Sequence, residues 1–182
     1  MRLFKSYVQF RLCINDLIDS PAVRDMNNYT QHSSVTTLEH CVFVAFLSFL
    51  MCKFFGWNYY AAARGGLLHD LFLYDWHDED RRGKLHGLTH PTTALNNAVT
   101  YFELSNMEKD IIKKHMWPIT IILPRYKESY VVSFADKICT CSEVLGFSKI
   151  IWIRRIMKLK TAKEKLVDEI LEYSNKLEFE NE

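Results

Sequence analysis

The segment 36–55 constrains the fold more than any other part of the chain, because it is apolar on nearly every side. If this segment is helical, no face of it suits water, so other elements must surround it. Only 6 glycines and 4 prolines interrupt the 182 residues, which favours long helices over many short strands separated by turns. We therefore expect an all-α fold, a bundle of about six to eight helices around this segment.

The remaining pattern predicts further helices and two loops. Alanines and glycines in 59–70 form a thin surface that allows close backbone approach. Helical spacing resumes at Pro91, a residue that suits the first turn of a helix. The predicted helical segments are 1–30 at the N-terminus, 59–70, 91–102, 107–115 and 127–145, and the predicted loops are 74–90 and 117–125. The last segment, 148–182, has an amphipathic pattern and is expected to form a helical C-terminal extension that packs on the same domain.

Composition indicates one ordinary domain without a strongly charged partner. The formal net charge of +1 gives no reason to expect nucleic acid or a membrane as a partner. Five cysteines without a C-x-x-C pair indicate neither a disulfide framework nor a structural zinc site. The N-terminus lacks the apolar block of a signal peptide, and the apolar run 41–52 is shorter than the roughly 20 residues that span a bilayer. We expect a cytoplasmic location.

Six residues of metal-ligand type fall at or near predicted helix ends or on inward faces. They are His40, His69, Asp70, His90, His115 and Asp136. Burial of an imidazole or a carboxylate costs free energy unless its polar atoms find partners. Asp136 shares an otherwise apolar helical stripe with Cys139 and Glu143, so a metal would be its natural partner.

These residue types suit a particular chemistry. Neutral imidazoles and carboxylates bind borderline divalent metals, and one carboxylate can bridge two of them. We expect Asp70 to be that bridge. Two cations about 3.5–4 Å apart lower the pKa of a shared water and stabilise the attacking and leaving oxygens at phosphorus. The pattern therefore favours hydrolysis at phosphorus.

The stretches LEHCVFVAF, GGLLHDL and FADKI stand in the order H, HD and D, and the chain resembles the HD phosphohydrolase superfamily over about residues 31–145. The resemblance implies an HD domain over 31–147 and metal ligation by the histidines and aspartates of these motifs. Those residues are His40, His69, Asp70 and Asp136. Many relatives have a Gly-Lys pair shortly after the HD motif, where this chain has LFLYDWHDED.

Two further histidines extend the resemblance. His90 in THPTTAL and His115 in IIKKHMWP are similar to the additional histidines of a subgroup with binuclear centres, which includes YqeK-like dinucleoside tetraphosphate hydrolases. The resemblance thus implies two divalent transition metals, of which Fe, Mn, Co and Zn are the candidates. The expected enzyme is a metal-dependent phosphohydrolase that cleaves a nucleotide or other small phosphorylated metabolite with a metal-bridging hydroxide.

Other polar residues are weaker candidates for roles around this site. We assign a catalytic role to Asp70 and, as a proton-transfer group, to Asp75, although acidic loop residues are usually just solvated. The candidates for substrate binding are His32, His77, Arg125, Lys127 and Lys137. His32 and His77 are equally compatible with solvated polar residues, a solvated loop fits Arg125 and Lys127 somewhat better than substrate binding does, and Lys137 could simply pair on the surface.

Two other functions use the same motifs. Non-haem di-iron oxygenases resembling myo-inositol oxygenase also draw on an H, HD, H, H, D set, and a degenerate HD binding module would keep the scaffold without the chemistry. The complete ligand set argues against the degenerate module. The sequence leaves open whether the chain forms a homodimer.

Overall fold

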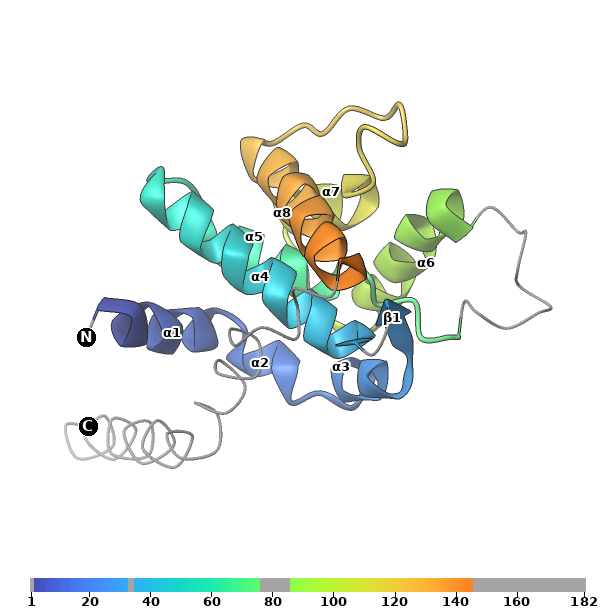
Figure 1. The fold of residues 1–182 in the computed structure, drawn as a ribbon, viewed down its shortest axis with the longest axis horizontal. Helices are drawn as coiled ribbons and strands as arrows, with labels where there is room; N and C mark the ends of the chain where they lie inside the picture. Colours follow the sequence, from blue (N-terminus) through green and yellow to red (C-terminus); the bar gives the residue numbers. More distant parts are fainter. Residues whose placement is uncertain (1, 33–34, 76–85, 146–182) are drawn as a thin grey trace.

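The computed structural model describes residues 2–32, 35–75 and 86–145, and this part of the chain is built almost entirely from helices (Figure 1). The helices are α1 (Arg2–Cys13), α2 (Asn15–Ile18), α3 (Pro21–Asp25), α4 (Thr37–Phe54), α5 (Tyr59–Leu68), α6 (His86–Tyr101), α7 (Asn106–Lys114) and α8 (Lys127–Val144), with a short 3-10 turn, η1 (Met26–Asn28). The strands β1 (Thr30–His32) and β2 (Val35–Thr36) pair antiparallel. The predicted all-α fold of six to eight helices is confirmed, and the expected C-terminal extension lies outside the described residues.

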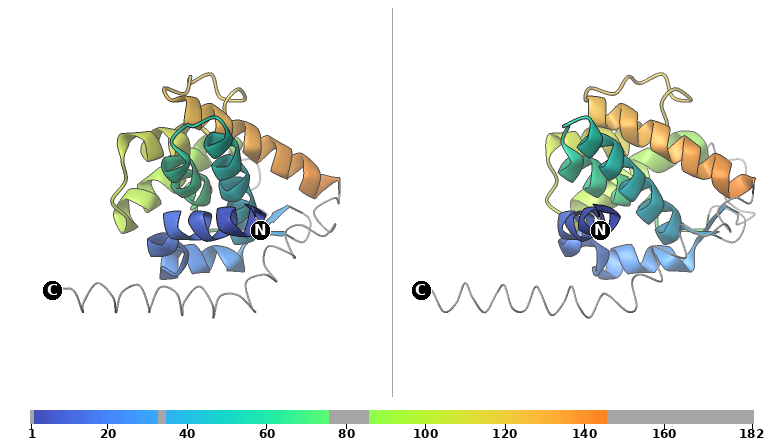
Figure 2. Two further views of the ribbon diagram at one scale, coloured as in Figure 1. Left: turned by 90° about the vertical axis from the view of Figure 1, so that its left-hand side faces the viewer. Right: turned by 60° about the vertical axis from the view of Figure 1, so that its left-hand side comes forward.

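The helix α4 occupies the centre, as the sequence predicts. It lies between the α1–α3 segment on one side and α7 and α8 on the other (Figures 1 and 2). Its start is fixed by a capping box, in which the Thr36 side chain accepts from the Glu39 N–H and the Glu39 carboxylate accepts from the Thr36 N–H. Among the described residues, α4 alone is long and apolar enough to cross a membrane by length and composition. Half of it is buried inside the molecule, as in a core helix.

Two glycines of α5 bring three helices into close contact. A Cβ atom on Gly66 would lie 2.9 Å from the backbone Cα of Ala45 in α4, and a Cβ on Gly65 would lie 2.6 Å from the Ile111 side chain in α7. Real side chains do not tolerate such distances, so these positions require glycine. The thin surface predicted for this helix therefore lets α5 sit directly against α4 and α7.

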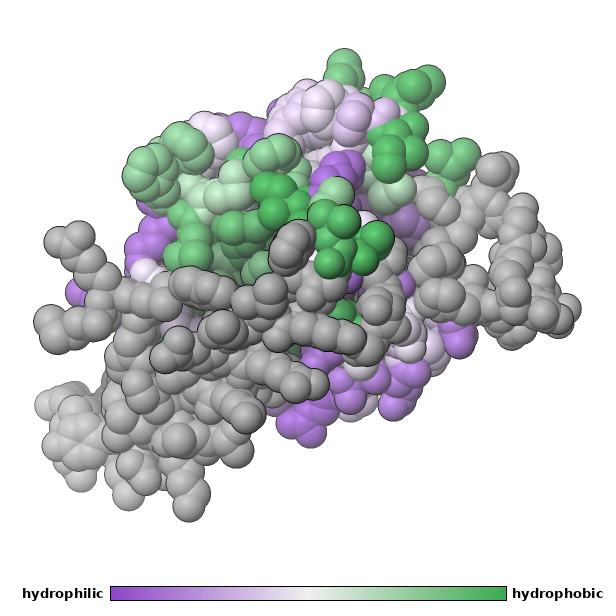
Figure 3. All heavy atoms as spheres, viewed as in Figure 1, coloured by the Kyte–Doolittle hydropathy of each residue, from purple (hydrophilic) through white to green (hydrophobic). Residues whose placement is uncertain are grey.

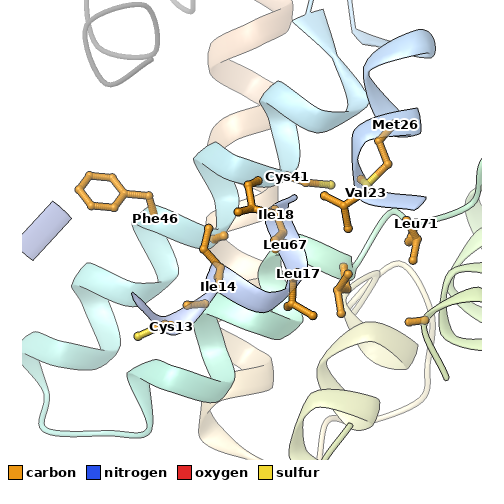
Figure 4. Packing of buried hydrophobic residues seen from close by; sticks show 14 of the residues in the cluster. Cys13, Ile14, Leu17, Ile18, Val23, Met26, Cys41, Phe46, Leu67 and Leu71 are labelled. Carbon is orange, nitrogen blue, oxygen red and sulfur yellow. The ribbon is translucent and has the colours of Figure 1, made fainter. Parts of the chain in front are cut away.

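The N-terminal segment shares the core with the central helices. Ile14, Leu17 and Met26 are fully buried and belong to one apolar cluster with Cys41 of α4 and Leu67 of α5 (Figure 4). A second cluster lies between α4, α5, α7 and α8. Its buried members are Val44, Cys52, Ala62, Ile111, Val131, Val132, Ala135 and Cys139. The two clusters hold α4 and α5 in place from opposite sides.

Two elements differ from the prediction. Helix α6 begins at His86, so the predicted loop ends before that residue, and Pro91 lies inside the helix instead of in its first turn. Proline has no backbone N–H, so the carbonyl of Gly87, four residues earlier, lacks its usual helical hydrogen bond. The other helical hydrogen bonds can persist. The β1–β2 hairpin was not predicted, because strands of three and two residues are too short for an alternating pattern to be visible.

The helix α8 carries apolar side chains on its outer face as well as on its inner one. Phe134 is 57% exposed and Val144 is 67% exposed, and the preceding loop adds Ile121, which is 94% exposed. Hydrophobic residues gather visibly on this side of the molecule (Figure 3). These outer side chains take no part in either core cluster.

Candidate metal centre

The structure brings all six expected ligands into one buried cluster. His40 comes from α4, His69 and Asp70 follow the last turn of α5, His90 lies on α6, His115 ends α7 and Asp136 lies on α8. None of the six is more than 8% exposed. Five helices therefore converge on one point through residues that are far apart in the sequence.

One half of the cluster, the first half-site, consists of His40, His69 and Asp136. Asp136 Oδ1 lies 3.2 Å from His40 Nε2 and 3.7 Å from His69 Nε2. The three side chains each offer a ligand atom, and these atoms lie within 4.8 Å of one another. Two imidazoles and a carboxylate at this separation can share one divalent ion.

The second half-site consists of Asp70, His90 and His115. Asp70 Oδ1 lies 3.2 Å from His90 Nε2 and 3.4 Å from His115 Nε2, and the two histidine nitrogens are 2.8 Å apart. The other carboxylate oxygen, Asp70 Oδ2, lies 3.4 Å from His69 Nε2 in the first half-site. Asp70 thus turns one oxygen toward each half-site, the arrangement expected of a bridging ligand. His69 also lies within reach of the second half-site, since its ligand atom groups with those of Asp70 and His115.

Hydrogen bonds at Nδ1 direct three of the imidazoles inward. His69 and His115 are the C-caps of α5 and α7, and each Nδ1 donates to a carbonyl three residues earlier, at Gly66 (2.8 Å) and Ile112 (2.9 Å). Carbonyls in the last turn of a helix lack backbone partners, so the local structure supplies the acceptor. His40 Nδ1 lies 3.0 Å from both carboxylate oxygens of Glu143. These bonds fix the rings and leave Nε2 facing the cluster.

Two atoms at the centre lack a hydrogen-bond partner. Among the described residues, four buried side-chain polar atoms have no such partner, and two of them are His69 Nε2 and Asp70 Oδ1. A buried polar atom without a partner costs about 1–3 kcal/mol. A lone pair on each of these atoms could instead bind a cation, so the donor set fits a metal.

The carboxylates of the cluster stabilise positive charge on neighbouring groups, as the pKa values of His40 and Asp70 indicate. Burial by itself lowers the pKa of His40, but hydrogen bonds to Asp136 and Glu143 outweigh burial and raise that pKa to about 10. Burial raises the pKa of Asp70, yet the charges of His69 and His90 hold it well below its ordinary value. Burial, together with the charge of His69, lowers the pKa of His115 to about 3. A divalent cation would supply the positive charge that protons on the histidines otherwise provide.

Two buried residues of the site were not identified from the sequence. Glu143 is fully buried against His40, and its position on the stripe of Asp136, two turns further along α8, was the available signal. Gln31 donates from Nε2 to Asp70 Oδ2 over 2.6 Å. No sequence feature indicated Gln31, because its position beside Asp70 depends on the β1–β2 hairpin, which was not predicted.

The basic residues considered for substrate binding are placed differently from one another. Lys137 Nζ donates to the His115 carbonyl over 2.9 Å and lies 3.4 Å from Asp136 Oδ2, so it borders the cluster. Lys127 is exposed and lies 4.8 Å over the Trp57 ring, nine residues or about 13 Å along α8 from Asp136. Arg125 is also exposed, and its backbone N–H donates to Asp110. The structure therefore brings Lys137, but neither Lys127 nor Arg125, to the border of the candidate metal centre.

The remaining predicted residues lie near or outside the described part. Asp75 is exposed, five residues beyond Asp70. His32 ends β1 and its side chain is not described, and His77 lies outside the described residues.

Comparison with known proteins found no matching family model, no matching curated protein and no matching solved structure. Functional inference therefore depends on the geometry of this cluster and on the motifs that compose it.

Proposed function

We propose that the protein is a metal-dependent phosphohydrolase of the HD type, which cleaves a phosphate ester or anhydride in a nucleotide or other small phosphorylated metabolite. The observation that carries the proposal is the position of Asp70. Its Oδ2 lies 3.4 Å from His69 Nε2, while its Oδ1 lies 3.2 and 3.4 Å from the Nε2 atoms of His90 and His115. A carboxylate between two sets of neutral nitrogen ligands suits a pair of divalent ions.

The ligands divide between the two ions. His40, His69 and Asp136 would hold the first ion, His90 and His115 would hold the second, and Asp70 would bind both. Two transition-metal ions, with Fe, Mn, Co and Zn as candidates, would acidify a water molecule and offset negative charge at phosphorus. No nucleophilic side chain is then required.

The chain itself contributes charge at the border of the cluster. Lys137 has a side chain that is 30% exposed and is held against Asp136 and the His115 carbonyl, so its ammonium group is placed to attract an anionic substrate. Asp75 is exposed close to Asp70 along the chain and is our candidate for accepting or returning a proton. The Lys137 ammonium and the Asp75 carboxylate are both accessible to solvent, so a dissolved substrate can reach them.

Ligand variants and a panel of phosphorylated metabolites test this proposal. Asp70→Ala should abolish phosphate release and reduce occupancy of both half-sites, because both ions lose a ligand. His90→Ala or His115→Ala should leave about one ion per chain and lower the rate by several orders of magnitude, since a single cation acidifies water less. Elemental analysis and phosphate release measure these outcomes, and Asn96→Ala, on the exposed face of α6, is the control that should match the parent.

One result would replace this proposal with another. Substrate-dependent oxygen uptake, with a mixed-valent iron signal in electron paramagnetic resonance and no phosphate release across the panel, would indicate a di-iron oxygenase. Near-parental activity and two bound ions in both His90→Ala and His115→Ala would remove the second half-site from the assignment.

A further inference from the structure

Gln31 is a buried amide that contacts the metal cluster without being one of the six expected ligands. It lies on β1 and is 7% exposed. Its Nε2 donates to Asp70 Oδ2 over 2.6 Å, and its Oε1 lies 3.3 Å from the Thr37 hydroxyl, whose single proton it shares with the Tyr29 carbonyl at 3.2 Å. Thr37 is itself 1% exposed in the first turn of α4. The amide is therefore held at both ends, which fixes its orientation.

This hydrogen bond makes the two oxygens of Asp70 unequal. Oδ2 accepts from Gln31 and still has a second lone pair on the side of the first half-site. Oδ1 has no hydrogen-bond partner among the described residues and lies 3.2 Å from His90 Nε2 and 3.4 Å from His115 Nε2. Rotation of the carboxylate would break the bond to Gln31, so the bond holds one oxygen toward each half-site.

We propose that Gln31 is a positioning residue, which keeps Asp70 in the bridging orientation and thereby sets the affinity of the second half-site for its ion. The inference rests on the two-metal centre proposed above. A side chain that only filled space could be replaced by any other of its volume. The bond to Asp70 is instead shorter than the usual 2.9–3.0 Å for an N–H donor, as expected when the acceptor is charged.

Manganese binding to the full-length chain tests this role. Gln31→Ala removes the amide, and Gln31→Met keeps a side chain of similar length without the donor. In both variants we expect the first Mn²⁺ to bind as in the parent and the dissociation constant of the second to rise about 10- to 100-fold. At equal total Mn²⁺, the electron paramagnetic resonance spectrum of a spin-coupled pair should give way to that of isolated Mn²⁺. Titration calorimetry and the spectrum together separate positioning from a loss of folding.

Asn97 provides a matched control. Its amide Nδ2 donates over 2.8 Å to the carbonyl of Leu71, the residue after Asp70, but does not reach the carboxylate. Asn97→Ala should bind both ions with parental affinity. The proposal is overturned if either Gln31 variant keeps parental affinity and the coupled spectrum, or if Asn97→Ala loses the second ion equally. If the parent binds fewer than two Mn²⁺, the two-metal centre fails and this inference fails with it.

Discussion

Glu143 is a fully buried carboxylate, and its burial is explained by the imidazole that it holds. Both of its oxygens lie 3.0 Å from His40 Nδ1, and its side chain is 0% exposed. Removal of a carboxylate from water costs several kcal/mol unless a positive or hydrogen-bonded partner offsets it. A carboxylate behind a histidine ligand fixes the ring and increases its basicity toward a metal. Glu143 therefore belongs to the candidate centre through its contact with His40, although it is not one of the six candidate ligands.

A charge-neutral replacement tests this role at the scale of one residue. Glu143→Gln keeps the shape and an acceptor oxygen but removes the charge, so the affinity of the first half-site should fall about 10- to 100-fold. Calorimetric titration with Zn²⁺ measures the change. Glu128→Gln is the matched control, because Glu128 is also buried on α8 but accepts from the Asn58 N–H, away from the cluster. Equal losses in the two variants would show a general effect on α8.

At the scale of elements, the ends of helices decide where the ligands lie. α5 stops at Leu68, so His69 and Asp70 leave the helix axis at the point where α5 contacts α4 and α7. Because Gly66 has no side chain, the backbone of α5 comes close to the backbone of α4 at Ala45. Between α7 and α8, Asp110 of α7 accepts from the Arg125 N–H and the Ser129 hydroxyl and pairs with Lys114, which joins α7 to the start of α8.

The contacts of Asp110 with Arg125, Ser129 and Lys114 should make a pH-dependent contribution to the free energy of unfolding. Burial raises the pKa of Asp110, but the bonds to Lys114, Arg125 and Ser129 outweigh burial and lower it below the ordinary 3.8. The folded-state pKa is thus depressed, so the contribution is present above about pH 3.8 and disappears as the pH falls through the folded pKa. Asp110→Asn should reduce the free energy of unfolding by about 1–2 kcal/mol at pH 7.

Urea unfolding at pH 7 and pH 3 measures this difference. The gap between Asp110→Asn and the parent should shrink at pH 3, while Glu103→Gln, an exposed control, should show none at either pH. A gap that stays constant across this range would mean that the charge of Asp110 does not stabilise these contacts.

The elements also show what the sequence could and could not predict. The four long helical patterns were visible because each buries a face, and α4, α5, α7 and α8 begin and end within two residues of their predicted positions. The six candidate ligands could be singled out because imidazoles and carboxylates are unusual on inward positions, and the structure brings them into one cluster. Gln31 could not, since a neutral amide is common on any surface and its contact to Asp70 joins positions 39 apart in the sequence. The start of α6 was missed because Pro91 was taken as a boundary.

At the scale of the whole molecule, metal binding and core packing are largely separate sources of stability. One apolar cluster joins α1–α7 and the other joins α4, α5, α7 and α8, and neither uses any of the six candidate ligands. The six candidate ligands lie on α4, α6 and α8 or at the ends of α5 and α7. Bound ions would therefore add links between these five helices. The fold should therefore persist without metal and become more resistant to unfolding with it.

Removal and return of metal test this separation. After chelation, far-ultraviolet circular dichroism should still report a helical protein, because apolar burial holds the core. Metal at 100 times its dissociation constant should add about 2.7 kcal/mol per half-site, which raises Tm by roughly 5–11 °C for a chain of this size. In His90→Ala the rise from one half-site should remain and that from the other should be lost, since the first half-site keeps His40, His69 and Asp136. A chelated protein without helical structure would mean that the metals, and not the two apolar clusters, hold these helices together, and an unchanged Tm on metal addition would mean that the buried cluster binds no metal.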